Sequence, residues 1–387
     1  MRNWMHIRAA DFIDFNPHLS IQKGSKATKV SMDKLRPYTK KIPEAEIAEY
    51  SGGSKFQNGD TIMARITPCL ENGKTAYVDI LLDNEIAFGS TEFIVMRAKP
   101  DISDSQFIYY LAISPMFRNI AIKSMVGSSG RQRVQQGVLE ELEVIVPPIK
   151  QQQEIGAFLA NIDSKIALNS KINDNLQQQA FAIFDKLMID ADNDVSTVSD
   201  YAYLNPKRVL PKGQITRSID MSQLSTSRAF PSGWDMRPYN GGMRFTNGDT
   251  LLARITPCLE NGKTAFIDFL GKDEVAFGST EYIVLAPRSG VPPEMLYCLA
   301  RYPAFVDYAV KNMNGSSGRQ RVSAETIGQF QLPKLDEQSL ATFREVVTPM
   351  FLKMRYNSFE NMRLSELRDS LLPRLMSGEI DVSNIRI

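Results

Sequence analysis

The chain has 387 residues, with 45 Lys+Arg against 44 Asp+Glu and 43% hydrophobic residues. This composition excludes a mainly disordered chain, and no apolar run approaches the roughly 18 residues that a membrane span needs. The formal charge of +1 argues against a generic polyanion binder but leaves room for local basic loops. The length allows about two or three domains. The three cysteines show no metal-ligand spacing and cannot form a disulfide framework, which indicates a cytoplasmic protein.

The first part of the chain predicts a module of mixed secondary structure. Strand composition, interrupted by turn residues, occurs at 61–66, 76–81 and 92–97. An amphipathic helix is expected over 104–122, and a closing strand over 142–147. Together these elements predict an α+β module.

A glycine-rich basic loop lies between that helix and the closing strand. It contains Ser128 and Ser129, followed directly by Arg131, Gln132 and Arg133, and no acidic residue occurs from 118 to 134. Arg can bond guanine through two hydrogen bonds and Gln can bond adenine, while Ser hydroxyls and backbone amides suit phosphates. A solvated turn explains one such loop more simply, so the weight of this hypothesis rests on its recurrence.

The segment 150–188 predicts a long helix. Its residues Ile155, Leu159 and Ile162 begin a series spaced alternately by four and three, which is the a/d seam of a coiled coil. Asn169 and Asn173 stand near the middle of this seam. A helix of this length would extend for about 58 Å at ~1.5 Å per residue.

The remainder of the chain repeats the first part. Residues 58–96 and 247–285 are identical at 28 of 39 positions, whereas 11–57 and 200–246 match at only 11 of 47. The basic loop recurs with Ser316, Ser317, Arg319, Gln320 and Arg321. Its exact duplication favours a binding role over a solvated turn. One interpretation makes the constant stretch a scaffold and the divergent stretch target-facing, and the reverse assignment stays open.

The seam also recurs 188 residues later, with Asn357 and Asn361 at its middle. Arg368 in this seam and Pro349 beside it make the second helix less ideal, and Pro349 can kink it. If the two helices are antiparallel, Asn169 and Asn173 can hydrogen-bond Asn357 and Asn361 and so fix the register, at a cost in stability. The alternative is that these asparagines lie at the exposed edge of the seam. The predicted fold class is α+β, with two repeated modules separated by two long antiparallel coiled-coil helices in a pseudo-twofold dumbbell.

The sequence lacks the motifs of the common enzyme sites. His6 and His18 have no histidine at the repeat-equivalent positions, and there is no phosphate-binding loop, dinucleotide fingerprint or adenine-methyltransferase motif. Asp60, Glu71 and Lys74 recur in the second copy, but their spacing favours a turn with solvated charges over a metal-dependent nuclease site. We therefore expect no catalytic residue, no metal site and no cofactor on this chain.

The candidate DNA-binding residues are those of the two basic loops together with basic neighbours. Arg65 and Arg254 are secondary candidates, with a salt bridge to Glu71 or Glu92 as an equally weighted alternative for Arg65. The full set is Arg65, Lys123, Ser128, Ser129, Arg131, Gln132, Arg133, Arg254, Lys311, Ser316, Ser317, Arg319, Gln320 and Arg321.

The order of two α+β modules and two long helices resembles the DNA-specificity subunit of type I restriction-modification systems. The stretches GDTIMARITPCLENGK and GDTLLARITPCLENGK resemble its target-recognition domains, and 147–155 and 364–380 resemble the entry to its central helix and its C-terminal tail. The resemblance implies target-recognition domain 1 at 1–148, a central spacer helix at 149–190, target-recognition domain 2 at 191–335, and a C-terminal spacer helix with tail at 336–387.

The resemblance also implies a function. Each domain would read one half of a bipartite target in double-stranded DNA, and two modification subunits carrying S-adenosylmethionine would methylate adenine. It leaves open whether restriction subunits, with ATP and Mg, join to cleave DNA. Because the modules are near-copies, we expect a nearly palindromic target. The alternatives are a stand-alone DNA-binding regulatory protein and an enzyme built on Asp60, Glu71 and Lys74.

Overall fold

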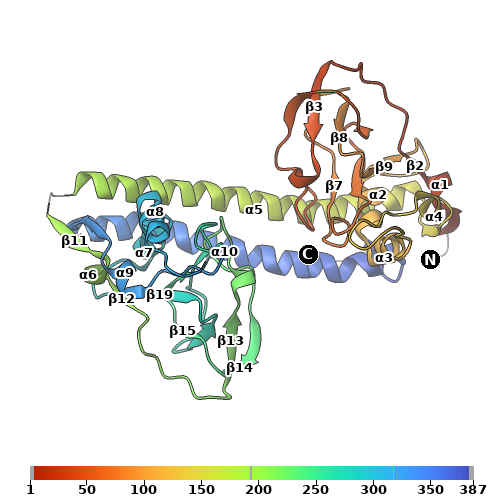
Figure 1. Cartoon of the computed structure of the whole chain (residues 1–387). Coiled ribbons are helices and arrows are strands. Elements are labelled where there is room, and N and C mark those ends of the chain that lie inside the picture. Colours follow the sequence, from red (N-terminus) through yellow and green to blue (C-terminus); the bar gives the residue numbers. More distant parts are fainter. Residues whose placement is uncertain (1–3, 192–193, 317, 383–387) are drawn as a thin grey trace. The chain divides into compact units, whose positions relative to one another are not determined.

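The computed structural model describes residues 4–191, 194–316 and 318–382, with the elements labelled in Figure 1. The chain divides into two compact units. Unit 1 comprises Met1–Lys165 and Leu364–Ile387, and unit 2 comprises Ile166–Arg363. Each unit contains one copy of the repeated module and a segment from each of two long helices, α5 (Ile149–Asp190) and α10 (Glu337–Met376).

Two four-stranded sheets form the module of unit 1. Their orders are β2-β9-β6-β7 and β4-β3-β8-β5, and β1 pairs with β10 in a separate antiparallel ladder. The β3–β8 pair is parallel, and the other pairs are antiparallel. The strands are β1 (Met5–Arg8), β2 (Ile13–Phe15), β3 (Lys26–Val30), β4 (Glu46–Glu49), β5 (Lys55–Phe56), β6 (Thr61–Ala64), β7 (Thr75–Tyr77), β8 (Ala87–Gly89), β9 (Phe93–Ala98) and β10 (Glu143–Val146).

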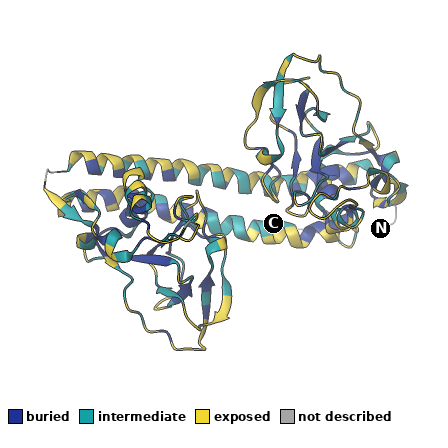
Figure 2. Ribbon diagram, viewed as in Figure 1, coloured by how far each residue is buried: buried dark blue, intermediate teal, exposed yellow. Residues whose placement is uncertain are grey.

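The central strands of this module are buried on both faces, as the dark blue of Figure 2 shows. Successive side chains of a strand point to opposite faces. In β6, Ile62 packs in the core beneath the second sheet, while Met63 packs in the core formed with the helices. In β9, Val95 and Ile94 divide in the same way. The strands expected at 61–66, 92–97 and 142–147 are confirmed as β6, β9 and β10. The strand expected at 76–81 is wrong over most of its length, because β7 ends at Tyr77.

The single helix expected over 104–122 is wrong, because two helices occupy this stretch. They are α2 (Ser105–Ile113) and α3 (Pro115–Lys123), joined by Ser114 in an extended conformation. Pro115 disfavours helical geometry at the residue before it and has no N–H to donate. Ser114 instead caps α3 by accepting a hydrogen bond from the Phe117 amide. Two one-turn helices complete the module, α1 (Ala9–Phe12) and α4 (Gln136–Glu140), together with a 3₁₀ turn at Met32–Lys34.

Unit 2 repeats this topology, with sheets β12-β19-β16-β17 and β14-β13-β18-β15 and the pair β11-β20. Its strands are β11 (Val195–Thr197), β12 (Ala202–Leu204), β13 (Ile215–Ile219), β14 (Asp235–Pro238), β15 (Met243–Phe245), β16 (Thr250–Ala253), β17 (Thr264–Phe266), β18 (Ala276–Gly278), β19 (Tyr282–Pro287) and β20 (Gln331–Pro333). Its helices are α6 (Val198–Tyr201), α7 (Pro293–Arg301), α8 (Pro303–Lys311) and α9 (Ala324–Gly328), with a 3₁₀ turn at Met221–Gln223.

The expected long helices are confirmed, and α10 runs without interruption through Pro349. Within unit 2 their segments are antiparallel, because the bonded positions ascend along α5 as they descend along α10. The Asn169 amide donates to Asn361 Oδ1 at 2.9 Å, and the Asn357 amide donates to Asn173 Oδ1 at 2.8 Å. Asn169 and Asn357 are buried and Asn173 and Asn361 are half-buried, so none of the four lies at an exposed edge. Their role in fixing the register stays a prediction.

Each module packs on its helix segments through a continuous apolar core. In unit 1 the buried residues of α2 contact Ile155 and Leu159 of α5 and Leu375 of α10. In unit 2 the buried residues of α7 join Phe184 of α5 and Val347 of α10. Over the described ranges, no helix combines the length and apolar character of a membrane span.

Candidate nucleic-acid interface

The basic loop of unit 1 is a tight turn with a fixed backbone. Val126 and Arg133 exchange backbone hydrogen bonds of 3.0 and 2.9 Å, and the Arg131 amide donates to the Ser128 carbonyl at 2.9 Å. Gly127 and Gly130 have φ of 136° and 79°, which favour glycine. A Cβ on Gly127 would lie 2.9 Å from the Arg131 carbonyl oxygen, so a side chain there would also collide with the turn.

A second chain segment holds this turn in place. The Val134 amide donates to the Arg65 carbonyl at 2.8 Å, and the Thr67 amide donates to the Gln132 carbonyl at 3.0 Å. The Gln132 amide donates in return to Thr67 Oγ1 at 3.0 Å. The structure therefore brings together two stretches that the sequence identified separately, the loop at 126–133 and the stretch after β6 that contains Arg65.

The three arginines at this site have different environments. Arg133 makes a forked ion pair with Glu92, at 2.7 Å for its closest atoms, and this carboxylate raises the pKa of Arg133. Arg65 donates to the Val134 carbonyl at 3.3 Å, so Glu92 pairs with Arg133 instead of the expected Arg65. Within the described ranges no carboxylate pairs with Arg131, which is exposed together with Ser128.

Unit 2 reproduces this arrangement. Asn314 and Arg321 exchange backbone bonds of 2.9 Å, and the Val322 amide donates to the Arg254 carbonyl at 3.0 Å. Arg321 pairs with Glu281 at 2.7 Å, which lowers the pKa of that carboxyl, while Arg254 lies 4.0 Å from the same group. Arg319 is exposed, and the described part of the chain offers it no carboxylate.

The remaining candidates lie around these turns. The side chains of Ser129 and Ser316 are on exposed loop positions, and Gln320 is half-buried beside Thr256. Lys123 and Lys311 are exposed at the ends of α3 and α8, and Lys311 lies 4.0 Å from Asp307. Ser317 lies outside the described residues.

Arg118, which the sequence places among the basic neighbours of the loop, has a structural contact instead. Its guanidinium donates to the carbonyl of Glu71 at 2.7 Å and stacks 5.3 Å from the ring centroid of Tyr38. In unit 2 the matching turn is held from another helix position, since Arg301 of α7 donates to the Gly262 carbonyl. Both arginines satisfy backbone carbonyls of a turn.

The residues suspected of nuclease chemistry do not form a site. The Lys74 ammonium donates to the Met32 carbonyl at 2.9 Å, and Asp60 is 1% exposed. Asp60 accepts two bonds of 2.7 Å from Arg97, so the expectation of solvated charges is wrong for Asp60 and Lys74. The turn itself is confirmed around Glu71. Among the described residues, no three His, Cys, Asp or Glu side chains gather in a way that could hold a metal ion.

The buried aspartate of unit 2 has a partner from a different position. Asp249 is held by Arg208, at 2.6 Å to each carboxylate oxygen, from the segment after β12. In unit 1 the partner Arg97 is on β9. Burial raises the pKa of Asp249 to about 6 against the opposing effect of Arg208. The two modules thus keep the carboxylate and differ in the arginine that pairs with it.

The sequence alone did not show that Glu92 and Glu281 are the partners of Arg133 and Arg321. Both glutamates belong to the repeated GlySerThrGlu stretch, and both arginines belong to the repeated loop. The sequence signal for this contact was that both copies retain the glutamate and the arginine at matching positions. The two members of each pair are 41 and 40 positions apart in the chain, so no local pattern joins them.

The fold and these turns define a class: a protein with two matched recognition modules, each presenting a fixed arginine-bearing turn, packed on two long helices. A family model described as the type I restriction modification DNA specificity domain matches residues 1–178. Residues 1–178 therefore carry this DNA specificity domain, and the chain is similar over most of its length to a type I restriction enzyme specificity subunit. Such subunits are non-catalytic, bind DNA and assemble with other restriction-modification subunits.

Individual relatives agree with this assignment. The chain is 23% identical to the type I restriction enzyme HindI specificity subunit of Haemophilus influenzae, over 84% of this chain and 87% of the relative. It is 33% identical to the EcoAI specificity subunit of Escherichia coli, over 35% of this chain and 21% of the relative. The fold is similar to the crystal structure of the type I S subunit from M. genitalium, with a TM-score of 0.57, 16% identity and 96% coverage of both chains.

Proposed function

We propose that the two turns read the two halves of a bipartite DNA target, and that the chain thereby directs adenine methylation and DNA cleavage by partner subunits. The observation that carries this proposal is the set of matching backbone hydrogen bonds around both loops, with Arg131 and Arg319 exposed and without a carboxylate partner in the described ranges. A guanidinium in that state can bond a guanine edge or a phosphate without first breaking an ion pair.

The neighbouring groups suit the same partner. Exposed serine hydroxyls and backbone amides of a turn bind phosphate oxygens, which orient a protein on the duplex without reading sequence. Arg133 and Arg321 are held by Glu92 and Glu281, so they keep the turn in shape and add less free positive charge. This arrangement is consistent with a net charge of only +1, because the basic groups are confined to a few positions.

The target should be nearly palindromic. The turns and the stretches that hold them are near-copies, and this likeness supports half-sites of similar sequence. The segments that differ most, 25–57 and 214–246, contain β3, β4 and β5 in unit 1 and β13, β14 and β15 in unit 2. Base contacts from these strands would make the half-sites differ.

The partners would supply the chemistry. We expect two modification subunits that bring S-adenosylmethionine, and restriction subunits that bring ATP and Mg where cleavage occurs. On this proposal the chain needs no cofactor of its own, because its contribution is the choice of site.

The decisive experiment substitutes the exposed arginine of each turn in the reconstituted methyltransferase. Arg131→Ala should raise the Kd for the target about 5- to 150-fold, because a bidentate base contact is worth roughly 1–3 kcal/mol. Arg319→Ala should do the same through the other half-site. Arg8→Ala is the control of equal charge, since Arg8 pairs with Asp11 and Glu141 away from the turn.

The salt dependence separates the two kinds of contact. A lost phosphate contact lowers the slope of log K against log salt by about 0.9, whereas a lost base contact relaxes specificity at one position. Unchanged affinity and unchanged methylation in both variants would remove the turns from the interface. Mapping methylated adenines across the host genome tests the target itself, and two unrelated half-sites would contradict the palindromic proposal.

A further inference from the structure

The helix segments that carry the two modules can be compared position by position. We call the α5 and α10 surface under the module of unit 1 seat 1, centred on Asp163 and Arg368. Seat 2 is the corresponding surface in unit 2, centred on Phe351 and Ala180. The helices begin at Ile149 and Glu337, 188 residues apart, and the same offset relates these central positions.

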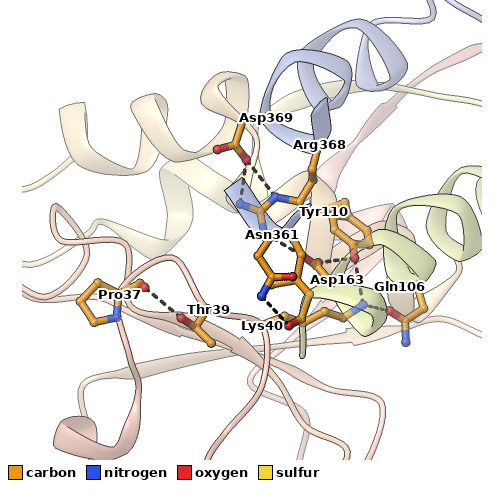
Figure 3. Close-up of polar contacts among 10 residues, drawn as sticks. Pro37, Thr39, Lys40, Gln106, Tyr110, Asp163, Asn361, Arg368 and Asp369 are labelled. Atoms are coloured by element: carbon orange, nitrogen blue, oxygen red, sulfur yellow. Dashed lines mark hydrogen bonds and ion pairs between the residues drawn. The ribbon is translucent and has the colours of Figure 1, made fainter. Parts of the chain in front are cut away.

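Seat 1 is a charged network in which Lys40 and Tyr110 are buried while Asp163 and Arg368 are half-buried, shown in Figure 3. Arg368 donates to Asp163 at 2.7 Å, and the Tyr110 hydroxyl donates to the same carboxylate at 2.6 Å. The Lys40 ammonium lies 3.1 Å from the Tyr110 hydroxyl and donates to Gln106. Lys40 is 8% exposed, and burial lowers its pKa to about 8.

Aromatic rings complete the surroundings of this lysine. Its ammonium lies 5.2, 5.1 and 4.7 Å from the ring centroids of Tyr77, Tyr109 and Tyr110, respectively. Cation–π attraction and the nearby carboxylate together offset part of the cost of burying the charge. Module 1 therefore brings a cation and a hydroxyl to seat 1, and the helices supply the anion.

Seat 2 has apolar groups at the positions that match Lys40, Tyr110, Asp163 and Arg368, whereas the counterpart of Gln106 is the buried Glu294. Lys40 corresponds to Ala229, because Tyr77 and its counterpart Phe266 donate their amides to the carbonyls of Lys40 and Ala229 at 3.0 and 2.7 Å. Tyr110 corresponds to Cys298, since α2 and α7 are both nine residues long and 188 residues apart. These counterparts and the two central residues of seat 2 are all buried: Ala180, Ala229, Cys298 and Phe351.

The ring of Phe351 fills the space that this exchange creates. It lies 5.3 Å from the ring of Phe266 and 5.6 Å from that of Tyr297, and these rings correspond to two of the three around Lys40. Small Ala229 and Cys298 leave room for it. Seat 2 and module 2 are thus complementary in shape and polarity, as seat 1 and module 1 are in charge.

A third pair of matched positions on the long helices differs in the size of the side chain. α5 has Gly156 where the start of α2 touches it, and a Cβ there would lie 2.8 Å from Asp104 and 2.9 Å from Gln106. The counterpart on α10 is Arg344, whose guanidinium donates to the Gly290 carbonyl at 2.9 Å. A module fitted to the glycine of seat 1 would meet an arginine on seat 2.

We infer that seats 1 and 2 are selective docking surfaces, each of which accepts its own recognition module and rejects the other. Seat 1 takes the module that brings Lys40 and Tyr110, and seat 2 takes the module that brings Ala229 and Cys298. A module 1 on seat 2 would bury its lysine against Phe351 without a carboxylate. Burying one member of a charged set without the others is strongly destabilising, whereas a fully apolar set is not. The free-energy cost of placing a module on the wrong seat is therefore larger than the gain from placing it on its own seat.

A cycle of substitutions in the full-length chain tests this selectivity. The helix-side variant is Asp163→Leu with Arg368→Met, the module-side variant is Lys40→Met with Tyr110→Phe, and the third variant has all four changes. The helix-side variant should lower the ratio of folded to unfolded unit 1 about 100-fold, because it leaves the buried lysine without its anion. In the variant with all four substitutions, the ratio of folded to unfolded unit 1 should return to within about tenfold of the native value.

Hydrogen exchange of α2 and of residues 38–42 reports on unit 1 during denaturant titration. Phe351→Leu is the matched control, and it should affect exchange in α7 without affecting α2. If the helix-side variant is insoluble, recovery by the fourfold variant still supports the inference. Two results would overturn the inference. One is a four-substitution variant whose stability loss equals the sum of the helix-side and module-side losses, and the other is a helix-side variant as stable as the native chain.

An exchange of modules tests rejection directly. Residues 1–148 replace 191–335 in one chain, and a second chain carries the same replacement with Phe351→Asp, Ala180→Arg and Arg344→Gly. Only the second chain should protect the transplanted module from hydrogen exchange. Equal protection in the two chains, whether high or low, would contradict selective seats.

Discussion

The buried asparagines of the long helices allow a prediction whose magnitude follows from the contacts. Asn357 is fully buried, and its amide donates to Asn173 Oδ1 at 2.8 Å. Asn173→Leu removes that acceptor and leaves the amide without a partner where water does not reach. The cost should be about 1–3 kcal/mol, which lowers the ratio of folded to unfolded unit 2 about 5- to 150-fold.

The reciprocal substitution should cost less. Asn357→Leu removes both the amide and the Asn357 Oδ1, a buried atom that has no hydrogen-bond partner among the described residues. Asn173 keeps its bonds of 3.1 Å to the Met354 carbonyl and to Ser358 Oγ. Replacing both asparagines with leucine should be close to neutral, because no buried polar group is left behind.

Urea unfolding, with hydrogen exchange of the α5 and α10 segments in unit 2, measures these differences. The expected order of stability is the double variant and Asn357→Leu above Asn173→Leu. Equal losses for the two single variants would refute the reasoning, since it depends on which amide is left unsatisfied. Exchange in α2 of unit 1 serves as the internal control.

Three other predictions concern charged pairs. Burial raises the pKa of Asp249 from its usual value of 3.8 to about 6 in the folded state. This carboxyl therefore contributes stability that is fully present below pH ~4 and is lost as the pH rises through 6. Asp249→Asn should remove this share of the pH dependence, on the order of 2–3 kcal/mol, in thermal unfolding from about pH 4 to 7. An unchanged pH slope would contradict that assignment. Arg97→Ala leaves the buried Asp60 without its partner and should destabilise unit 1 by roughly 3–5 kcal/mol. The matched Arg208→Ala should destabilise unit 2 only. Urea unfolding followed by hydrogen exchange measures both losses. Equal loss in both units from either change would disprove it. Glu281→Gln leaves Arg321 without its carboxylate partner. The slope of log K against log salt for nonspecific DNA binding should then become steeper by up to about one unit. A slope equal to the native value would argue against a DNA-facing turn.

Much of the fold followed from local pattern. The period of the seam residues predicted α5 and α10, and strand composition predicted β6 and β9, because each signal lies within one element. The error over 104–122 also had a local cause, since Pro115 should have divided that helix. Short strands such as β5, with two residues, carry too little pattern to be recognised.

The candidate interface followed only in part. The duplicated loop identified Arg131 and Arg319, because two copies of one sequence mark what the module retains. The sequence did not show that Arg133 is ion-paired with Glu92, or that Arg118 holds a backbone turn. A guanidinium has the same appearance in a sequence whether it is free or paired.

By itself the sequence determined that this protein is one module used twice, with two long helices and two arginine-bearing loops, since identity and periodicity are properties of the chain alone. Only the tertiary structure decided what each charge contacts. Lys40, Tyr110, Asp163 and Arg368 are far apart in the chain, and they form one network because the module packs on both helices. The physical reason is that burial, and not residue type, determines whether a charge is solvated, paired or excluded from a surface.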